Sequence, residues 1–180
     1  MSDELLQNLR NAIRTVPDFP IEGIMFRDIT PVLSDPGLML GIIERFADDM
    51  EERGWRPDAV IGPEARGFIF APLLAAHLGI SFIPIRKPGK LPYKSHSVEY
   101  DLEYGSNSLE MHVDALEKGQ KVVIIDDLLA TGGTVSACVE LCQRSGAIPI
   151  GSLFVIELEG LGARERLNPL PIHALMEFPA

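Results

Sequence analysis

The sequence has little cysteine, and the two cysteines it has cannot build a metal cage. Cys138 and Cys142 are four residues apart, and no second Cys or His pair completes a zinc site. We expect reduced, partly buried thiols, as is usual for a cytoplasmic protein. A chain of 180 residues can bury a core without disulfides or metal, so we expect one domain over residues 1–180.

Long apolar runs are also missing. The most apolar stretch, residues 68–85, is interrupted by Pro72, His77, Gly79 and Pro84, which argues against a membrane span. The N-terminus begins with acidic residues and lacks the apolar centre of a signal peptide. A net charge of −10 disfavours general nucleic-acid binding. We therefore expect a cytoplasmic protein without a membrane or nucleic-acid partner.

One segment lacks acidic residues altogether. No Asp or Glu occurs from Ala65 to Val98, but five basic residues do: Arg66, Arg86, Lys87, Lys90 and Lys94. This charge of +5 leaves −15 for the rest of the chain. The segment could be an ordinary solvated surface, or it could line a concave site for a small polyanion, because local basic charge concentrates anions.

Strands and helices are predicted to alternate through most of the chain. Apolar spacing predicts helices at residues 5–16, 35–53, 67–78, 132–144 and 162–166, the second capped by Ser34, and strands at residues 59–62, 81–86, 121–126, 148–157 and 172–178. This order indicates an α/β fold with a mainly parallel central sheet flanked by helices. Residues 98–113 alternate instead like a hairpin, after a long loop of the kind that often forms a lid.

The most informative segment is residues 122–134, in which an apolar strand runs into Asp126 and Asp127 and then into a loop of small residues. Gly132 and Gly133 let the backbone approach a ligand, and amides at a helix N-terminus bind anions. The two carboxylates suit ribose hydroxyls or positive charge developing on a sugar. The Walker and dinucleotide-binding motifs are both absent. The segment therefore predicts a ribose-phosphate site.

This segment resembles the phosphoribosyl diphosphate (PRPP) signature of the type I phosphoribosyltransferases. Other segments resemble parts of the adenine-using members: residues 19–31 the base-binding stretch, 62–68 the pyrophosphate loop, 86–92 the flexible-loop entry and 99–105 the catalytic hood. The resemblance implies a single-domain type I phosphoribosyltransferase fold with an N-terminal hood at residues 1–33 and a flexible hairpin loop at residues 87–113. It also implies a homodimer that converts adenine and PRPP to AMP and pyrophosphate, a purine-salvage reaction, with Mg²⁺ held mainly by the substrate.

The resemblance further implies roles for individual residues. Three sets would bind parts of the substrates: the adenine set is Met25, Phe26 and Arg27; the 5-phosphate set is Ala130, Thr131, Gly132, Gly133 and Thr134; the pyrophosphate set is Glu64, Ala65, Arg66 and Lys87. The implied catalytic residues are Arg66, Asp126 and Asp127, with Glu103 exchanging a proton with the purine N9 and Tyr104 covering the site. The family pattern also predicts a cis or strained peptide between Glu64 and Ala65.

Plainer interpretations stay open at this point. Arg66 could form a surface ion pair with Glu64, Phe26 could be a core residue, and Glu103 a solvated glutamate of the hairpin. Transfer to a 6-oxopurine such as hypoxanthine or guanine would need a donor to the 6-oxygen, commonly a Lys, which we do not find near the hood. A non-catalytic PRPP-sensing regulator would need an added DNA-binding domain or a basic face.

Overall fold

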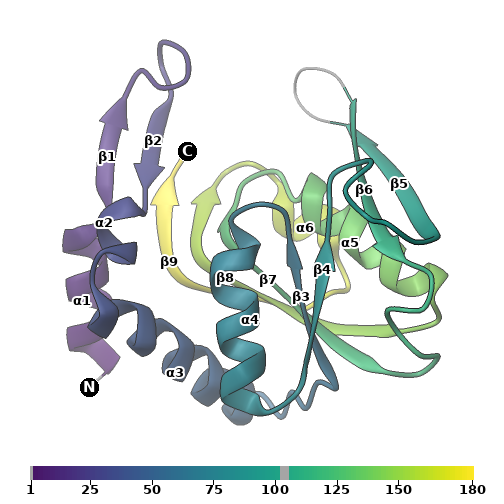
Figure 1. The fold of residues 1–180 in the computed structure, drawn as a ribbon. Helices are drawn as coiled ribbons and strands as arrows, with labels where there is room; N and C mark the ends of the chain where they lie inside the picture. The colour runs from purple at the N-terminus through teal and green to yellow at the C-terminus, as the bar shows by residue number, and fades with distance from the viewer. Residues whose placement is uncertain (1, 102–105) are drawn as a thin grey trace.

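The computed structural model describes residues 2–101 and 106–180, and a five-stranded parallel sheet forms its centre (Figure 1). Along the sheet the strands are β4 (Ser81–Ile85), β3 (Ala59–Pro63), β7 (Lys121–Leu129), β8 (Ile148–Glu159) and β9 (Ile172–Pro179). Every neighbouring pair in this order is parallel. The predicted α/β architecture is confirmed, with β7 at the centre of the sheet.

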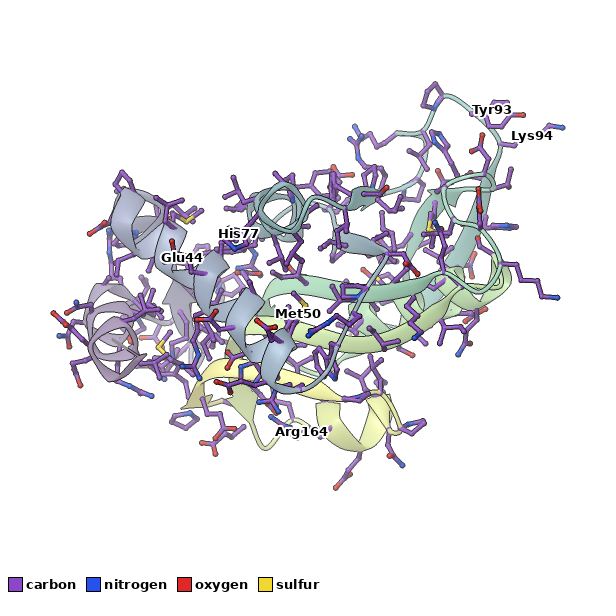
Figure 2. All side chains as sticks on the ribbon, turned by 90° about the horizontal axis from the view of Figure 1, so that it is seen from below. Glu44, Met50, His77, Tyr93, Lys94 and Arg164 are labelled. Carbon is purple, nitrogen blue, oxygen red and sulfur yellow. The ribbon has the colours of Figure 1, made fainter. Side chains whose placement is uncertain are left out.

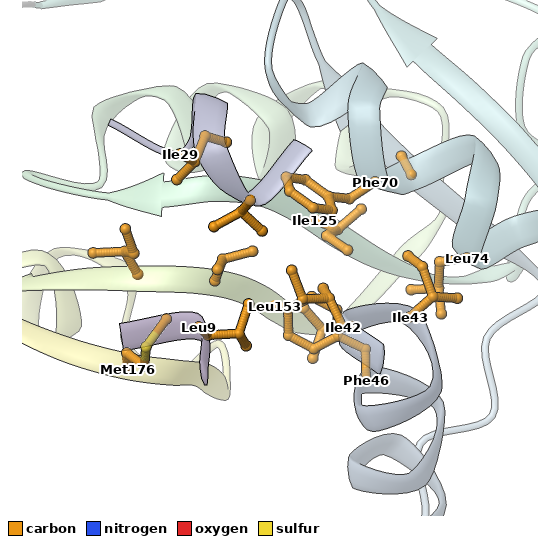
Figure 3. Packing of buried hydrophobic residues seen from close by; sticks show 14 of the residues in the cluster. Leu9, Ile29, Ile42, Ile43, Phe46, Phe70, Leu74, Ile125, Leu153 and Met176 are labelled. Carbon is orange, nitrogen blue, oxygen red and sulfur yellow. The ribbon is translucent and has the colours of Figure 1, made fainter. Parts of the chain in front are cut away.

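Helices cover both faces of the sheet. The helices α1 (Ser2–Ala12), α3 (Pro36–Glu52) and α4 (Gly67–Leu78), with the short α2 (Thr30–Leu33), pack on one face. The helices α5 (Gly133–Arg144) and α6 (Ala163–Leu167) pack on the other. Figure 3 shows the first core, which includes Phe46 of α3, Phe70 of α4 and Ile125 of β7. Because side chains alternate along a strand, Val122 and Ile124 reach the second core instead.

Two antiparallel ribbons complete the fold. The hood ribbon pairs β1 (Arg14–Pro17) with β2 (Met25–Asp28), and the hairpin pairs β5 (Ser95–Asp101) with β6 (Ser106–His112). In Figure 1 they rise on opposite sides of the edge where the parallel strands end. Figure 2 shows Tyr93 and Lys94, from the loop before the hairpin, at the far side of the molecule from Glu44 of α3.

Two local predictions at the N-terminal end were wrong. The first helix ends at Ala12 rather than Val16, because Val16 pairs with Phe26 across the hood ribbon, and this pairing overrides the helical spacing. The cap of α3 is Asp35 and not Ser34. Its Oδ1 accepts hydrogen bonds from the amides of Gly37 (2.8 Å) and Leu38 (3.1 Å), and Pro36 follows it as the first helical residue.

The base of the hairpin belongs to the core. Val98, Leu109 and Met111 are at most 3% exposed. Arg144 of α5 donates from Nη1 to the carbonyl oxygen of Ser97 at 2.8 Å. The base of the hairpin is therefore held by core contacts, although the resemblance implies a flexible loop over residues 87–113. The mobility itself stays a prediction.

The crossing from β3 into α4 leaves no room for a side chain at Gly67. A Cβ there would lie 2.6 Å from Cδ of Pro63 and 2.9 Å from the carbonyl oxygen of Ile125. We expect Gly67→Ala to destabilise the fold by about 1–3 kcal/mol, as overpacking does. Gly37→Ala is the control, since its Cβ would meet only the Asp35 carboxylate, at 3.2 Å. Urea unfolding of both variants measures this, and equal midpoints would contradict the expectation.

Candidate active site

The predicted phosphate loop lies at the carboxyl edge of the sheet. A cavity of about 200 Å³ opens there, lined by Arg66, Asp126 and residues 128–135. Arg66 follows β3 and the loop follows β7, and these neighbouring parallel strands bring the two segments to one edge. Thr131 and Thr134 therefore lie at the same edge of the sheet as Arg66. Wider hollows, such as one of about 440 Å³ between α1 and α3, lie away from these groups.

The loop leaves the N-terminus of α5 open toward this cavity. Gly132 precedes the helix with φ +79°, a conformation that glycine adopts at little cost. A Cβ on it would also lie 3.2 Å from Cγ of Leu167. No side chain caps the first amides of α5 within the described residues. Free amides and the helix dipole both favour an anion at this point.

The two aspartates differ in exposure. Asp126 lines the cavity, whereas Asp127 is 1% exposed and is not one of the residues that line it. The Asp127 carboxylate faces Arg66, with Nη1 and Oδ2 3.1 Å apart, but the pair lacks good hydrogen-bond geometry, and neither Asp127 oxygen has a hydrogen-bond partner among the described residues. The amide of Asp127 donates to Oδ1 of Asp126 at 2.9 Å. The plainer interpretation of Arg66 as a partner of Glu64 is therefore wrong.

Burial dominates the electrostatics of both aspartates. Removal from water raises the pKa of Asp126 well above its ordinary value, and the neighbouring Asp127 charge raises it further. Burial also raises the pKa of Asp127, although the Arg66 guanidinium opposes that shift. A cationic group entering the cavity would lower both pKa values, so these carboxylates are prepared to interact with positive charge.

The loop between β3 and α4 is tied to the end of β4. One Glu64 carboxylate oxygen accepts from Nε of Arg86 and from the amide of Lys87, each at 3.0 Å. These two donors, the Lys87 amide foremost, hold the pKa of Glu64 below its ordinary value although partial desolvation opposes them. Because its carboxylate is engaged in this way, Glu64 organises the loop, while Lys87 and Arg66 are both exposed.

Two further features of this loop bear on the sequence analysis. The peptide between Glu64 and Ala65 is cis, as the family pattern predicted. The backbone of Arg86 exchanges hydrogen bonds of 2.9 and 2.7 Å with that of Glu110 on β6. Arg86 thus links the hairpin to the pyrophosphate loop, a role that the sequence analysis missed although it counted Arg86 in the basic segment.

The hood presents apolar surface. Met25 is 44% exposed and Phe19 is 51% exposed. The half-buried ring of Phe26 meets that of Phe19 edge to face, with centroids 5.1 Å apart. Arg27 makes its contacts elsewhere, donating to Oγ1 of Thr15 at 2.6 Å and lying over the ring of Phe178. Glu103 and Tyr104 lie outside the described residues.

Comparisons with known proteins agree on one family. The model of the phosphoribosyl transferase domain matches residues 32–166. Adenine phosphoribosyltransferase of Petrotoga mobilis is 49% identical over 171 residues, 95% of this chain and 98% of that protein. The crystal structure of the adenine phosphoribosyltransferase from Thermoanaerobacter pseudethanolicus is 48% identical, with a TM-score of 0.93 over 96% of this chain and 99% of that one. The Saccharomyces cerevisiae enzyme, solved with an imino-altritol bisphosphate and adenine, is 39% identical, with a TM-score of 0.93 over 97% and 99%.

Proposed function

Since this chain belongs to the phosphoribosyltransferase family and, within it, to the adenine phosphoribosyltransferases, we propose that it transfers the 5-phosphoribosyl group of PRPP to adenine. The products are AMP and pyrophosphate, and the reaction salvages a free purine. One observation carries the assignment of residues: a single cavity joins the open N-terminus of α5, the Asp126 carboxylate and the Arg66 guanidinium.

The 5-phosphate binds at the loop before α5. The amides of residues 131–134 and the hydroxyls of Thr131 and Thr134 donate to its oxygens, and the helix dipole adds to their effect. The 12 residues of α5 are anchored in the second core through Val135, Cys138 and Leu141, which are at most 3% exposed. The donors are therefore held in place before the phosphate arrives.

The pyrophosphate and the ribose develop opposite charges as the bond between them breaks. Each is bound by protein groups of the complementary charge. Arg66 and Lys87 bind the pyrophosphate as negative charge develops on it, and Ala65 contributes its backbone. Asp126 faces the ribose and stabilises the positive charge that develops there as the bond breaks. Asp127 acts mainly through Arg66, because it is 1% exposed and its carboxylate lies 3.1 Å from the Arg66 guanidinium.

The hood holds the base. Phe26 stacks on adenine, while Met25 and the backbone around Arg27 border the ring. Glu103 exchanges the proton of N9, and Tyr104 covers the site from the hairpin tip. The described strands of the hairpin support this assignment, since both ribbons rise beside the carboxyl edge (Figure 1).

The residues of this site fit a Mg²⁺ ion that is bound mainly by oxygens of the substrate. No three His, Cys, Asp or Glu side chains gather into a metal cage within residues 2–101 and 106–180. One carboxylate in a phosphate-binding cavity is instead the donor set that Mg²⁺ commonly shares with substrate oxygens. Bound there, the ion neutralises charge on the pyrophosphate. Asp126 is the residue that would approach it.

A homodimer is also part of the proposal, and α4 supports it. This helix is apolar on all sides, yet Leu73 is 44% exposed and its neighbours Ile69 and Pro72 are only half-buried. A helix that is apolar all round is normally covered, and a second copy of the chain would cover it here.

None of the described helices is long and apolar enough to cross a membrane. The buried, unpaired Cys138 and Cys142 support the cytoplasm as the proposed compartment.

A product assay tests the proposed function. With PRPP and Mg²⁺, we expect AMP from adenine and at least 100-fold slower product formation from hypoxanthine or guanine, because loss of matched hydrogen bonds costs about this much or more. Chelation of Mg²⁺ with EDTA should stop AMP formation, and added Mg²⁺ should restore it. Faster transfer to hypoxanthine would favour the 6-oxopurine reaction. PRPP binding without any product would favour a regulator.

A further inference from the structure

The hood ribbon has no strand partner in the central sheet. Its strands β1 and β2 pair only with each other in the described structure. A two-stranded ribbon is at best marginally stable by itself. Its orientation over the site must therefore come from side chains that join it to the body of the protein.

Arg27 makes such a connection. Its guanidinium carbon lies 4.7 Å from the centroid of the Phe178 ring, and Nη2 donates to the carbonyl oxygen of Pro179 at 3.4 Å. Both partners are at the end of β9, which Figure 1 shows beside β2. Phe178 is 9% exposed and also lies 4.8 Å from the guanidinium of Arg10 in α1.

The contacts of Arg27 with the end of β9 also fix the direction of the neighbouring side chain, Phe26. Successive side chains of a strand point to opposite faces, so the direction of Arg27 sets the direction of Phe26. The Nε of Arg27 is buried without an acceptor in the described structure. The guanidinium therefore depends on the Phe178 ring, the Pro179 carbonyl and the Thr15 hydroxyl for its place.

We propose that Phe178 is a positioning residue for the purine base: it holds Arg27 and so keeps Phe26 turned toward the site. The inference rests on the proposed function, since Phe26 is taken to stack on adenine. Phe178 does not touch the substrates. It acts on adenine through the hood, and PRPP binding at the loop before α5 and at Arg66 does not depend on it.

Three variants test this role. Phe178→Leu keeps an apolar side chain but removes the ring, Phe178→Tyr keeps the ring, and Arg10→Ala removes the second guanidinium without touching the hood. We expect Phe178→Leu to raise KM for adenine about 3- to 10-fold, the effect of losing a partly buried cation–π contact. KM for PRPP should change less than about 2-fold. Phe178→Tyr and Arg10→Ala should stay near wild type in both.

A second measurement does not need turnover. Hydrogen exchange of the β1 and β2 amides should speed up in Phe178→Leu and not in Arg10→Ala. Unchanged exchange, an unchanged KM for adenine, or equal rises in both KM values would overturn the inference. A wild-type enzyme that forms no AMP would refute the proposed function instead, and exchange would still test the link between Phe178 and the hood.

Discussion

Asp126→Asn is expected to lower kcat at least 100-fold while making the ligand-free protein more stable. Asp126 lines the cavity in which we propose that the ribose cation develops, and removing one such electrostatic group typically costs about 10²–10³ in rate. The same carboxylate is unfavourable without substrate, because burial and Asp127 raise its pKa. Asparagine keeps an oxygen that can accept from the Asp127 amide.

The stability gain has a pH signature. A carboxyl with a raised pKa binds its proton more tightly in the folded protein than in the unfolded chain. The contribution of Asp126 to the free energy of unfolding is therefore most favourable at low pH. This contribution is lost as pH rises from about 4, where the unfolded carboxyl titrates, to the raised folded pKa. The thermal midpoint of Asp126→Asn should therefore exceed that of wild type at pH 7 by a few degrees, and the difference should shrink toward pH 4.

Asp127→Asn is the matched control, one residue away on the same strand. This substitution removes the carboxylate that faces Arg66 and should therefore change KM for PRPP more than kcat. The Asp127 carboxylate faces Arg66 rather than the cavity. Steady-state kinetics and thermal melts between pH 4 and pH 8 measure both variants. A kcat for Asp126→Asn within 5-fold of wild type would remove Asp126 from the chemistry.

Arg66→Ala is expected to raise KM for PRPP about 100-fold or more. A guanidinium beside a multiply charged anionic leaving group forms charge-assisted hydrogen bonds, each worth about 1.5–3 kcal/mol. The Arg66 side chain is 46% exposed, so its removal leaves no cavity in the core. Its loss does leave the buried Asp127 carboxylate without a nearby cation, and that carboxylate will then take up a proton more readily.

A double variant separates these two effects. Arg66→Ala with Asp127→Asn removes the buried charge together with its partner, so folding should recover while PRPP binding does not. Thermal melts and initial rates over a range of PRPP concentrations give both quantities. If the double variant regained normal KM for PRPP, Arg66 would have only a structural role.

The sequence predicted the parts of this protein that depend on local pattern. The alternation of apolar strands and helices yielded the parallel sheet, and the run from Asp126 to Thr134 indicated an anion site beside a diol because each residue type has a local use there. Gly79 ends α4 in the left-handed conformation at φ 68°, as its position after the last apolar residue suggested.

Features that depend on residues far apart in the sequence were harder to predict. Val16 has helical spacing but lies in a strand, because its neighbour Phe26 is ten residues away across a turn. The unequal exposure of Asp126 and Asp127 depends on how β7 continues to Leu129 and on where Arg66 reaches from β3. Nothing in the residues around Phe178 indicated that the C-terminal strand would meet Arg27.

The two cores found on either face of the sheet support the two ribbons separately. The hood rests on the first core through Ile13, Ile29 and Phe178, and the hairpin rests on the second through Leu109 and Met111. Strand β7 sends side chains into both. Only the single layer of the sheet separates the supports of the two ribbons, and its central strand also carries Asp126, which lines the cavity.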